Sequence, residues 1–307
     1  MSGQTTIRSP VRFSHRGILS GRVASIRLRP GPVNSGIVFN DSIPARTRYA
    51  SVEDHFVNLS DGTTTIMAVE HLLAACYGLG IDNLQVEVTG GEVPFGDGSA
   101  LPFIRILRAA GLRVGQVARK TQSLNRPIVV NQDDAFVCAL PAPGDMTGFA
   151  SNPDRVPGHG TTERLQINYF ICFPDAELGE QFFGCHPTTA NFAETLGCAR
   201  TFGYRQNGQR LPAWIGRVRR AAPGEELKSS KGEEFKSLKS GAGQRTTDDL
   251  ILPARPRFAD EPVRHKTLDL LGDLCLLGRR LNALIFAYKA GHRLHHQLVR
   301  ELEDQWT

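Results

Sequence analysis

The first half of the chain alternates short strand patterns with two longer helical patterns. Residues 23–39, VASIRLRPGPVNSGIVF, alternate apolar and polar positions around a Pro/Gly turn and predict a β-hairpin. Residues 63–80 predict a helix that begins after a threonine cluster and ends near Gly78. Residues 83–88 predict a strand, and residues 96–111 predict a turn followed by a second helix. This order predicts a first unit built from strand, helix, strand and helix.

The second half continues with a similar mixture of strands and helices. It follows the polar segment 120–127, which ends in proline and is the predicted boundary between domains at residues 1–124 and 125–307. The predicted elements are strands at 127–130, 135–140, 165–173 and 283–291, and helices at 191–204, 262–274 and 292–306. Because each half mixes strands with helices, the pattern predicts an α+β fold with a layered arrangement in both halves.

One segment, residues 216–248, differs in composition from the rest of the chain. It is rich in Lys, Glu, Ser and Gly and has almost no large apolar residues, which predicts a flexible insert. Residues 205–257 contain 12 Lys/Arg and 6 Asp/Glu, a surplus of +6, so the net charge of +5 leaves the remainder near −1. The basic charge therefore belongs to one segment and not to a folded face, which argues against nucleic-acid binding as the function.

The composition, with 40% hydrophobic and 22% charged residues, is that of a soluble globular protein. No apolar run approaches the roughly 18 residues of a transmembrane helix. The six cysteines form no C-x-x-C pair, so we expect buried, reduced thiols and a cytoplasmic location. Six arginines precede the first acidic residue, Asp41, as in a transit peptide, which makes an organelle matrix the second prediction.

The stretch PVRHKTLDLLGDL, residues 262–274, combines an apolar helical face with a line of polar side chains. His265, Asp269 and Asp273 recur every four residues, which brings them onto one stripe of the helix, with Lys266 beside them. A histidine and a carboxylate four residues apart can bind one metal ion, but the same spacing is more often an ion pair on a helix surface. The stretch alone leaves both interpretations open.

A second unusual position lies in the first predicted helix, where Glu70 and His71 stand among apolar residues. Polar side chains buried there without partners would cost on the order of several kcal/mol. A metal ion held by His71, His265 and Asp269 would satisfy both positions and leave a fourth coordination site for water. Glu70, adjacent to a ligand but not itself a ligand, could then accept a proton from that water.

The remaining histidines give weaker signals. His292 stands at a predicted junction of strand and helix, where a histidine is often an ordinary surface residue. His295 and His296 lie on the predicted outer turns of the last helix, and we expect them to be surface residues without a role. Four further histidines show no partner pattern and are left unassigned: His15, His55, His159 and His186.

Five segments follow one another in an order that identifies a family: AVEHLLAACYGLGIDNLQVEV, PFGDGSALPF, CARTFGY, EPVRHKTLDLLGDL and AYKAGH. They resemble the zinc-dependent UDP-3-O-acyl-N-acetylglucosamine deacetylases over residues 15–205 and 258–300. The resemblance implies an enzyme that removes the N-acetyl group from UDP-3-O-acyl-N-acetylglucosamine and releases acetate, the committed step of lipid A biosynthesis. It also implies two similar domains, each a small, mostly antiparallel sheet packed on two helices, with the active site at the domain interface.

The resemblance assigns the metal and the proton transfers to single residues. It implies that His71, His265 and Asp269 bind Zn²⁺, and the same ligand types are compatible with Fe²⁺. Glu70 is implied as the general base, and His292 as the general acid or as an imidazolium that stabilises the oxyanion.

Further roles follow from the same resemblance. Asp273 would orient His292 and keep it protonated, while Thr201 and Lys266 would contact the substrate or the developing oxyanion. Leu19 and Phe202 are the other implied substrate contacts. The turn and helix cap at Asp97 and Ser99 are expected to be structural. The expected partner is the UDP-sugar with its acyl chain, and we expect a monomer.

Two departures from the family pattern limit these expectations. Residues 205–258 lack the G-G-S segment and the N-A-I-V strand of the family, which puts binding of the acyl chain in doubt. The segment is a divergent insert, a feature of a paralogue with altered specificity, or the product of an incorrectly predicted gene. HRGILSG, residues 15–21, keeps Leu19 and Gly21 of the family pattern but has Ser20 in place of its histidine. The alternative function is therefore a catalytically impaired relative that binds a nucleotide-sugar or an acyl lipid.

Overall fold

A computed structural model describes most of the chain. The described ranges are residues 3–53, 55–142, 164–174, 178–205, 217–219, 249–253 and 255–306. The predicted flexible insert at 216–248 lies almost entirely outside them.

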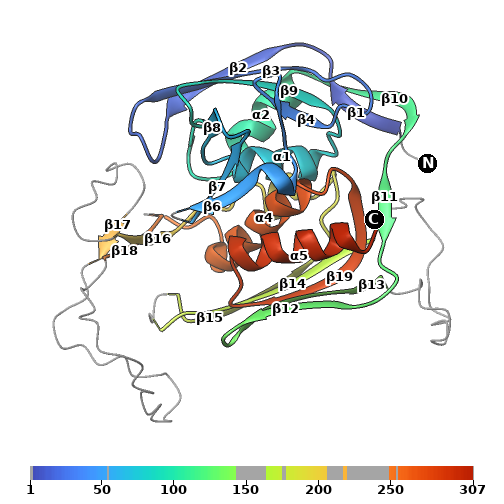
Figure 1. Ribbon diagram of the computed structural model, residues 1–307. Helices are drawn as coiled ribbons and strands as arrows, with labels where there is room; N and C mark the ends of the chain where they lie inside the picture. Colours follow the sequence, from blue (N-terminus) through green and yellow to red (C-terminus); the bar gives the residue numbers. More distant parts are fainter. Residues whose placement is uncertain are drawn as a thin grey trace, which may run out of the picture.

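A five-stranded sheet forms the first layer, in the upper part of Figure 1. Its order is β2-β3-β9-β4-β5, and every neighbouring pair is antiparallel except β4 with β9. The strands are β2 (Val11–Arg16), β3 (Val23–Pro30), β9 (Leu84–Thr89), β4 (Ile37–Phe39) and β5 (Ile43–Pro44). The strict alternation of β9 directs Leu84, Val86 and Val88 into the core.

A second sheet, at the bottom of Figure 1, has the same strand order as the first. Its path is β12-β13-β19-β14-β15, on which β14 and β19 are the parallel pair, and β11 also pairs in parallel with β19. In each sheet the central strand, β9 or β19, comes last in the sequence. The first hairpin (β2–β3 or β12–β13) lies on one side of it, and the second hairpin (β4–β5 or β14–β15) lies on the other. The strands are β12 (Ile128–Gln132), β13 (Ala135–Pro141), β19 (Arg280–Tyr288), β14 (Leu165–Cys172), β15 (Glu180–Cys185) and β11 (Thr121–Ser123).

The helices labelled α1, α2, α4 and α5 in Figure 1 lie between the two sheets. The described α-helices are α1 (Glu70–Leu79), α2 (Leu101–Ala109), α3 (Phe192–Thr195), α4 (Glu261–Cys275) and α5 (His292–Asp304). Every residue of α1 is buried, and after Glu70 and His71 its sequence is apolar on all sides, as expected for a buried helix. The predicted α+β fold with several sheets and helices is therefore confirmed.

Shorter elements complete the described structure. They are β1 (Gly3–Ile7), which pairs with β10 (Leu112–Ala118), the 3₁₀ helix η1 (Thr47–Tyr49), the antiparallel sheet of β6 (Ala50–Glu53), β7 (Phe56–Ser60) and β8 (Thr65–Ile66), and the sheet of β16 (Gly203–Arg205), β18 (Asp249–Leu252) and β17 (Arg217–Arg219).

Glycine allows α1 and α4 to approach closely. A Cβ atom at Gly272 of α4 would lie 2.5 Å from the backbone oxygen of Glu70, the first residue of α1. No real Cβ contact is that short, so any larger residue at Gly272 would push the two helices apart. The spacing of the two helices is therefore set at the residue that begins α1.

The predicted hairpin over residues 23–39 is wrong in its pairing, although both of its strands are present. β3 and β4 do not pair with each other, because β9 lies between them and pairs with both. Gly31 permits the crossing, since a Cβ atom there would lie 2.5 Å from the backbone nitrogen of Leu84. An alternating pattern predicts strands, but it does not say which later strand inserts between them.

The first helix begins and ends later than predicted. α1 starts only at Glu70, because the threonine cluster contributes to β8 and Ala68 has a left-handed φ of 57°. It ends at Gly80, whose φ of 70° provides the left-handed C-cap. Gly78 lies inside the helix, where the absence of a side chain admits the ring of Phe192.

The predicted helix over residues 191–204 is wrong beyond its first turn, since only α3 forms. The backbone N–H of Arg200 donates to the Glu261 carboxylate at 2.9 Å, and that of Thr201 donates to the Gly98 carbonyl at 2.8 Å. Hydrogen bonds to distant parts of the chain thus replace the helical ones. A pattern of apolar spacing contains no information about such partners.

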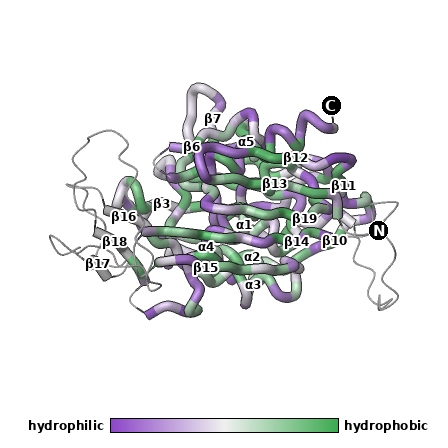
Figure 2. The backbone as a smooth tube through the Cα atoms, turned by 90° about the horizontal axis from the view of Figure 1, so that it is seen from below, coloured by the Kyte–Doolittle hydropathy of each residue, from purple (hydrophilic) through white to green (hydrophobic). Residues whose placement is uncertain are grey.

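The second sheet has one face toward the helices and one face away from them. Figure 2 views it from below, with β12, β13, β19, β14 and β15 side by side. Exposed Val129, Phe136, Phe170 and Phe182 alternate along these strands with buried or half-buried residues.

The cysteines fit the predicted burial only in part. Cys76 and Cys275 are buried and the other four are half-buried, and all six are free thiols. No helix in the described ranges is both long enough and apolar enough to cross a membrane.

The close approach of α1 and α4 at Gly272 gives a first prediction. Gly272→Ala should lower the stability of the protein by about 1–3 kcal/mol through overpacking, even though alanine favours a helix by about 1 kcal/mol. Gly115→Ala in β10 is the matched control, because a Cβ atom there meets only the Gln4 carbonyl oxygen at 3.4 Å. Thermal unfolding should show a lower melting temperature for the first variant only; equal shifts would contradict the proposed helix contact.

Candidate metal centre and active site

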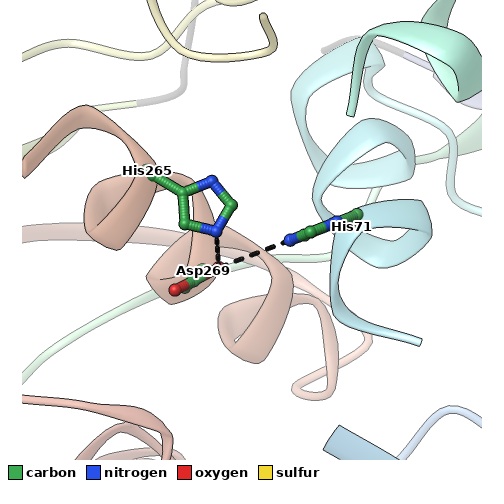
Figure 3. Close-up of side chains that lie close together, drawn as sticks. All are labelled: His71, His265 and Asp269. Atoms are coloured by element: carbon green, nitrogen blue, oxygen red, sulfur yellow. Dashed lines mark ion pairs between the residues drawn. The ribbon is translucent and has the colours of Figure 1, made fainter. Parts of the chain in front are cut away.

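Helices α1 and α4 bring three predicted ligands together (Figure 3). Nε2 of His265 lies 3.3 Å from Oδ1 of Asp269, and Nε2 of His71 lies 3.8 Å from the same oxygen. One ligand atom from each residue falls within 4.8 Å of the other two, and all three residues are buried. The two imidazole nitrogens point at the carboxylate from different helices, so the three donors converge on one point.

The protonation of these residues suits a metal cation. Burial lowers the pKa of His71 to about 3, and burial also lowers the pKa of His265. Burial raises the pKa of Asp269, but neighbouring His265, Lys266 and His292 outweigh it and hold the pKa at about 2. Two neutral imidazoles and one ionised carboxylate are the donor set of a catalytic metal site with an open position.

The far side of the His265 ring is also fixed. Its Nδ1 lies 3.0 Å from the Ala199 carbonyl oxygen, which can only accept a hydrogen bond. Nδ1 therefore carries the proton, and the lone pair of Nε2 faces Asp269. Such a second hydrogen bond orients a metal-binding histidine and increases its basicity. The three residues therefore fit a divalent metal ion.

Glu70 lies at the N-terminus of α1, directly before His71, and is buried. Its Oε2 accepts a hydrogen bond of 3.1 Å from the backbone N–H of Val57. Burial raises the pKa of Glu70 to about 7, and the nearby charge of His292 opposes this rise in part. A carboxylate with such a pKa can accept and release a proton near neutral pH.

His292, the first residue of α5, approaches the same centre from a third helix. Its Nδ1 lies 2.7 Å from Oδ2 of Asp273, and its Nε2 lies 3.9 Å from Oδ2 of Asp269. Burial alone would lower the pKa of His292, but the charge of Asp273 and the hydrogen bond to it raise the pKa to about 9. Nζ of Lys266 is 3.5 Å from Oδ2 of Asp269, which places a second cation at the site.

The residues expected to contact substrate are not equally close to this centre. The Phe202 ring lies edge-on to the His265 ring, with centroids 6.5 Å apart, and also contacts Phe173 at 5.7 Å. Thr201 is half-buried, and among the described residues its hydroxyl donates a long hydrogen bond of 3.4 Å to the carbonyl oxygen of Phe202. Leu19 is exposed, and no hydrogen bond or ring contact links it to the three ligands.

The loop that carries Leu19 is held by a residue that sequence reasoning missed. The fully buried carboxylate of Glu92 accepts hydrogen bonds from the backbone N–H groups of Leu19, at 2.8 Å, and Ser20, at 3.0 Å. Gly17 packs against this carboxylate, since a Cβ atom there would lie 2.1 Å from it. The partners are far apart in the sequence, so only the glycine-rich loop itself was a visible signal.

Asp97 and Ser99 form the predicted turn. Oδ1 of Asp97 accepts hydrogen bonds from the backbone N–H and hydroxyl of Ser99, and the Ser99 hydroxyl accepts one from the backbone N–H of Leu101. Asp97 also forms an ion pair of 2.7 Å with Arg257. The turn therefore connects the start of α2 to the segment that precedes α4.

The expectation that His295 and His296 are surface residues is wrong. Both are buried, and each donates a hydrogen bond to Asp273, at 2.8 and 3.1 Å. The sequence contained a signal of this, because His295 stands three, four and seven residues before Leu298, Val299 and Leu302, the buried stripe of α5. His292, His295 and His296 thus converge on one carboxylate.

The fold and site define a class of protein: a metal-dependent hydrolase with an α+β fold and a buried histidine–carboxylate centre. The family profile described as LpxC, UDP-3-O-acyl N-acetylglycosamine deacetylase, matches residues 4–214 and 245–304. The chain belongs to this family.

Curated relatives are similar over nearly their whole length. Proteins named UDP-3-O-acyl-N-acetylglucosamine deacetylase from Thermosynechococcus vestitus and Thioalkalivibrio sulfidiphilus are each 32% identical, over 98% and 100% of this chain and 94% and 92% of their own. The protein of that name from Citrifermentans bemidjiense is 31% identical over 97% of this chain and 88% of its own. Between its two matched ranges the family profile leaves residues 215–244 of this chain unmatched, and these overlap most of the segment 216–248 that differs in composition.

The buried carboxylate beneath the Leu19 loop gives a second prediction. In Glu92→Gln, one backbone N–H of the loop would face the NH₂ group of the amide in place of an oxygen. The lost hydrogen bond should lower the stability of the loop by about 1–3 kcal/mol. Amide hydrogen exchange at Leu19 and Ser20 should become faster. Glu87→Gln is the control, because the Glu87 side chain is half-exposed and forms a long ion pair of 3.8 Å with Arg27, which contributes little to stability. This variant should leave amide exchange in the loop unchanged. Unchanged exchange in Glu92→Gln would refute the role of this carboxylate.

Proposed function

We propose that the protein removes the N-acetyl group of UDP-3-O-acyl-N-acetylglucosamine by metal-dependent amide hydrolysis, as its relatives are named to do. The observation that carries the proposal is the convergence of His71 from α1 with His265 and Asp269 from α4. Family membership provides the substrate, and the buried Glu70 beside the ligands provides a proton acceptor.

The three ligands would hold Zn²⁺, and Fe²⁺ is compatible with the same donors. A bound divalent ion would polarise the amide carbonyl and lower the pKa of water to roughly 7. Glu70 would accept a proton from the attacking water, because its pKa of about 7 allows it to be ionised near neutral pH. Its anchoring hydrogen bond from Val57 would hold the carboxylate in place.

Two cations, His292 and Lys266, would act on the leaving nitrogen and the oxyanion of the amide that is hydrolysed. His292, with a pKa raised to about 9, would hold a proton that it can donate to the leaving nitrogen or direct at the developing oxyanion. Asp273 would orient His292, and Lys266 would add positive charge beside Asp269. Donors of this kind each contribute about 3–4 kcal/mol to stabilising the transition state in other hydrolases.

We further propose that the site lies between two domains, residues 1–124 and 125–307. The identical strand order of the two sheets supports this division, as does the supply of ligands from α1 and α4. Thr201, Phe202 and Leu19 would contact the substrate, Phe202 beside His265 and Leu19 from the loop on Glu92. A monomeric state and a cytoplasmic location stay predictions.

The ligand assignment gives a third prediction. His265→Ala should reduce bound metal from about one ion per chain to near zero, because two donors do not retain a divalent ion in competition with a chelator. Elemental analysis after dialysis measures this directly. His186→Ala is the control, since His186 is exposed on the loop after β15 and should retain the metal. Wild-type metal content in His265→Ala would exclude the assignment.

The proton acceptor gives a fourth prediction. Glu70→Gln should lower kcat by about 10²–10⁴-fold, because an amide cannot accept the proton, while metal content stays at the wild-type value. The measurement is acetate release from UDP-3-O-acyl-N-acetylglucosamine, with Glu87→Gln as the unaffected control. If the wild-type protein binds metal but releases no acetate from substrates of any acyl length, the impaired-relative hypothesis replaces the deacetylase.

A further inference from the structure

Asp273 is surrounded by more donors than the orientation of one histidine requires. Its Oδ2 accepts hydrogen bonds from Nδ1 of His292, at 2.7 Å, and Nδ1 of His295, at 2.8 Å. Its Oδ1 accepts one from Nε2 of His296, at 3.1 Å. The carboxylate is completely inaccessible to solvent, so these three imidazoles replace the water that would otherwise stabilise its charge.

The hydrogen bonds continue beyond Asp273 into the second sheet. The Tyr169 hydroxyl, on β14, lies 2.9 Å from Nε2 of His295 and 2.8 Å from the Ala290 carbonyl oxygen. An ionised carboxylate only accepts hydrogen bonds, so Nδ1 of His295 must carry a proton. In the neutral ring Nε2 is then an acceptor, so the single Tyr169 O–H is shared between Nε2 and the Ala290 carbonyl oxygen. Burial lowers the pKa of His295 to about 4, which is consistent with a neutral ring.

The consequence for His292 is geometric. Both oxygens of Asp273 are occupied from α5, so the carboxylate cannot rotate about its terminal bond without breaking one of these hydrogen bonds. With Asp273 fixed, Nδ1 of His292 is fixed, and its Nε2 stays turned toward Asp269. Tyr169 adds a contact at Ala290, two residues before His292, and so also restrains the junction between β19 and α5.

We infer that Tyr169, His295 and His296 are positioning residues, which act through Asp273 to hold the His292 ring toward the metal centre. The inference rests on the proposed function for the role of His292, but the arrangement itself can be tested without turnover. None of the three residues needs to touch substrate. They form the rigid support that gives one histidine a single orientation.

The first test is Tyr169→Phe, which removes one hydroxyl and keeps the buried ring. We expect kcat for acetate release to fall by about 10–100-fold, with KM and bound metal unchanged. Tyr288→Phe is the matched control, because Tyr288 is a half-buried residue of β19 that stacks on Phe136, and its variant should have wild-type kcat. A wild-type kcat in Tyr169→Phe would overturn the role of the tyrosine.

A second pair of variants separates orientation from packing. His295→Gln retains an N–H group that can donate to Asp273, whereas His295→Leu has similar bulk and no donor. Activity should be substantially higher in the glutamine variant than in the leucine variant. Equal activities would mean that His295 acts only by filling space.

A third measurement does not depend on turnover. In the metal-loaded protein with ¹⁵N-labelled histidine, NMR should show a slowly exchanging Nδ1–H for His292 and a single set of ring signals. Both signatures should weaken in Tyr169→Phe and His295→Leu. If the wild-type protein releases no acetate but these signals change as expected, the proposed function fails and the positioning network stands. Unchanged His292 signals in both variants would refute the network.

Discussion

The close packing of α1 against α4 is the constraint on which the site depends. His71 belongs to one helix, and His265 and Asp269 belong to the other, so their convergence requires the two backbones to stay at a fixed distance. Gly272 makes this distance possible, because any side chain there would collide with the backbone of Glu70. The residue that limits the approach is thus Glu70, the proposed proton acceptor. The packing of the two helices therefore also fixes where this carboxylate lies.

Burying so many ionisable groups in this contact would be destabilising unless each had a partner. Each carboxylate is paired with cations or donors: Asp269 with Lys266 and the surrounding imidazoles, and Asp273 with three imidazoles. The arrangement divides the roles of the histidines. Burial keeps His71 neutral as a ligand requires, whereas the adjacent Asp273 keeps His292 charged. Environment, and not residue type, separates the proposed ligand from the proposed proton donor.

Local periodicity predicted α4, α5 and seven strands of the two large sheets, and the four-residue polar stripe of α4 identified His265, Asp269 and Asp273. These features depend on neighbours within two turns, which a sequence displays directly. The failures involve partners distant in the chain. Tyr169 and His295 are 126 residues apart, and Leu19 and Glu92 are 73 apart. Strand β9 likewise enters between β3 and β4 from a later part of the chain. No spacing rule connects such residues.

The two sheets have the same strand order, yet they supply different chemistry to the site. α1 precedes the central strand β9 and α4 precedes the central strand β19, so equivalent helices face each other and each provides a ligand. The helices that follow these strands are also equivalent, but they diverge in content. The start of α2 carries the Asp97 turn, which binds Arg257, whereas the start of α5 carries His292. A symmetric scaffold would place two identical half-sites on either side of the ligands. With a structural turn at one of these positions and a histidine at the other, the centre is not symmetric, and the proposed proton acceptor lies on α1 while the proposed proton donor lies on α5.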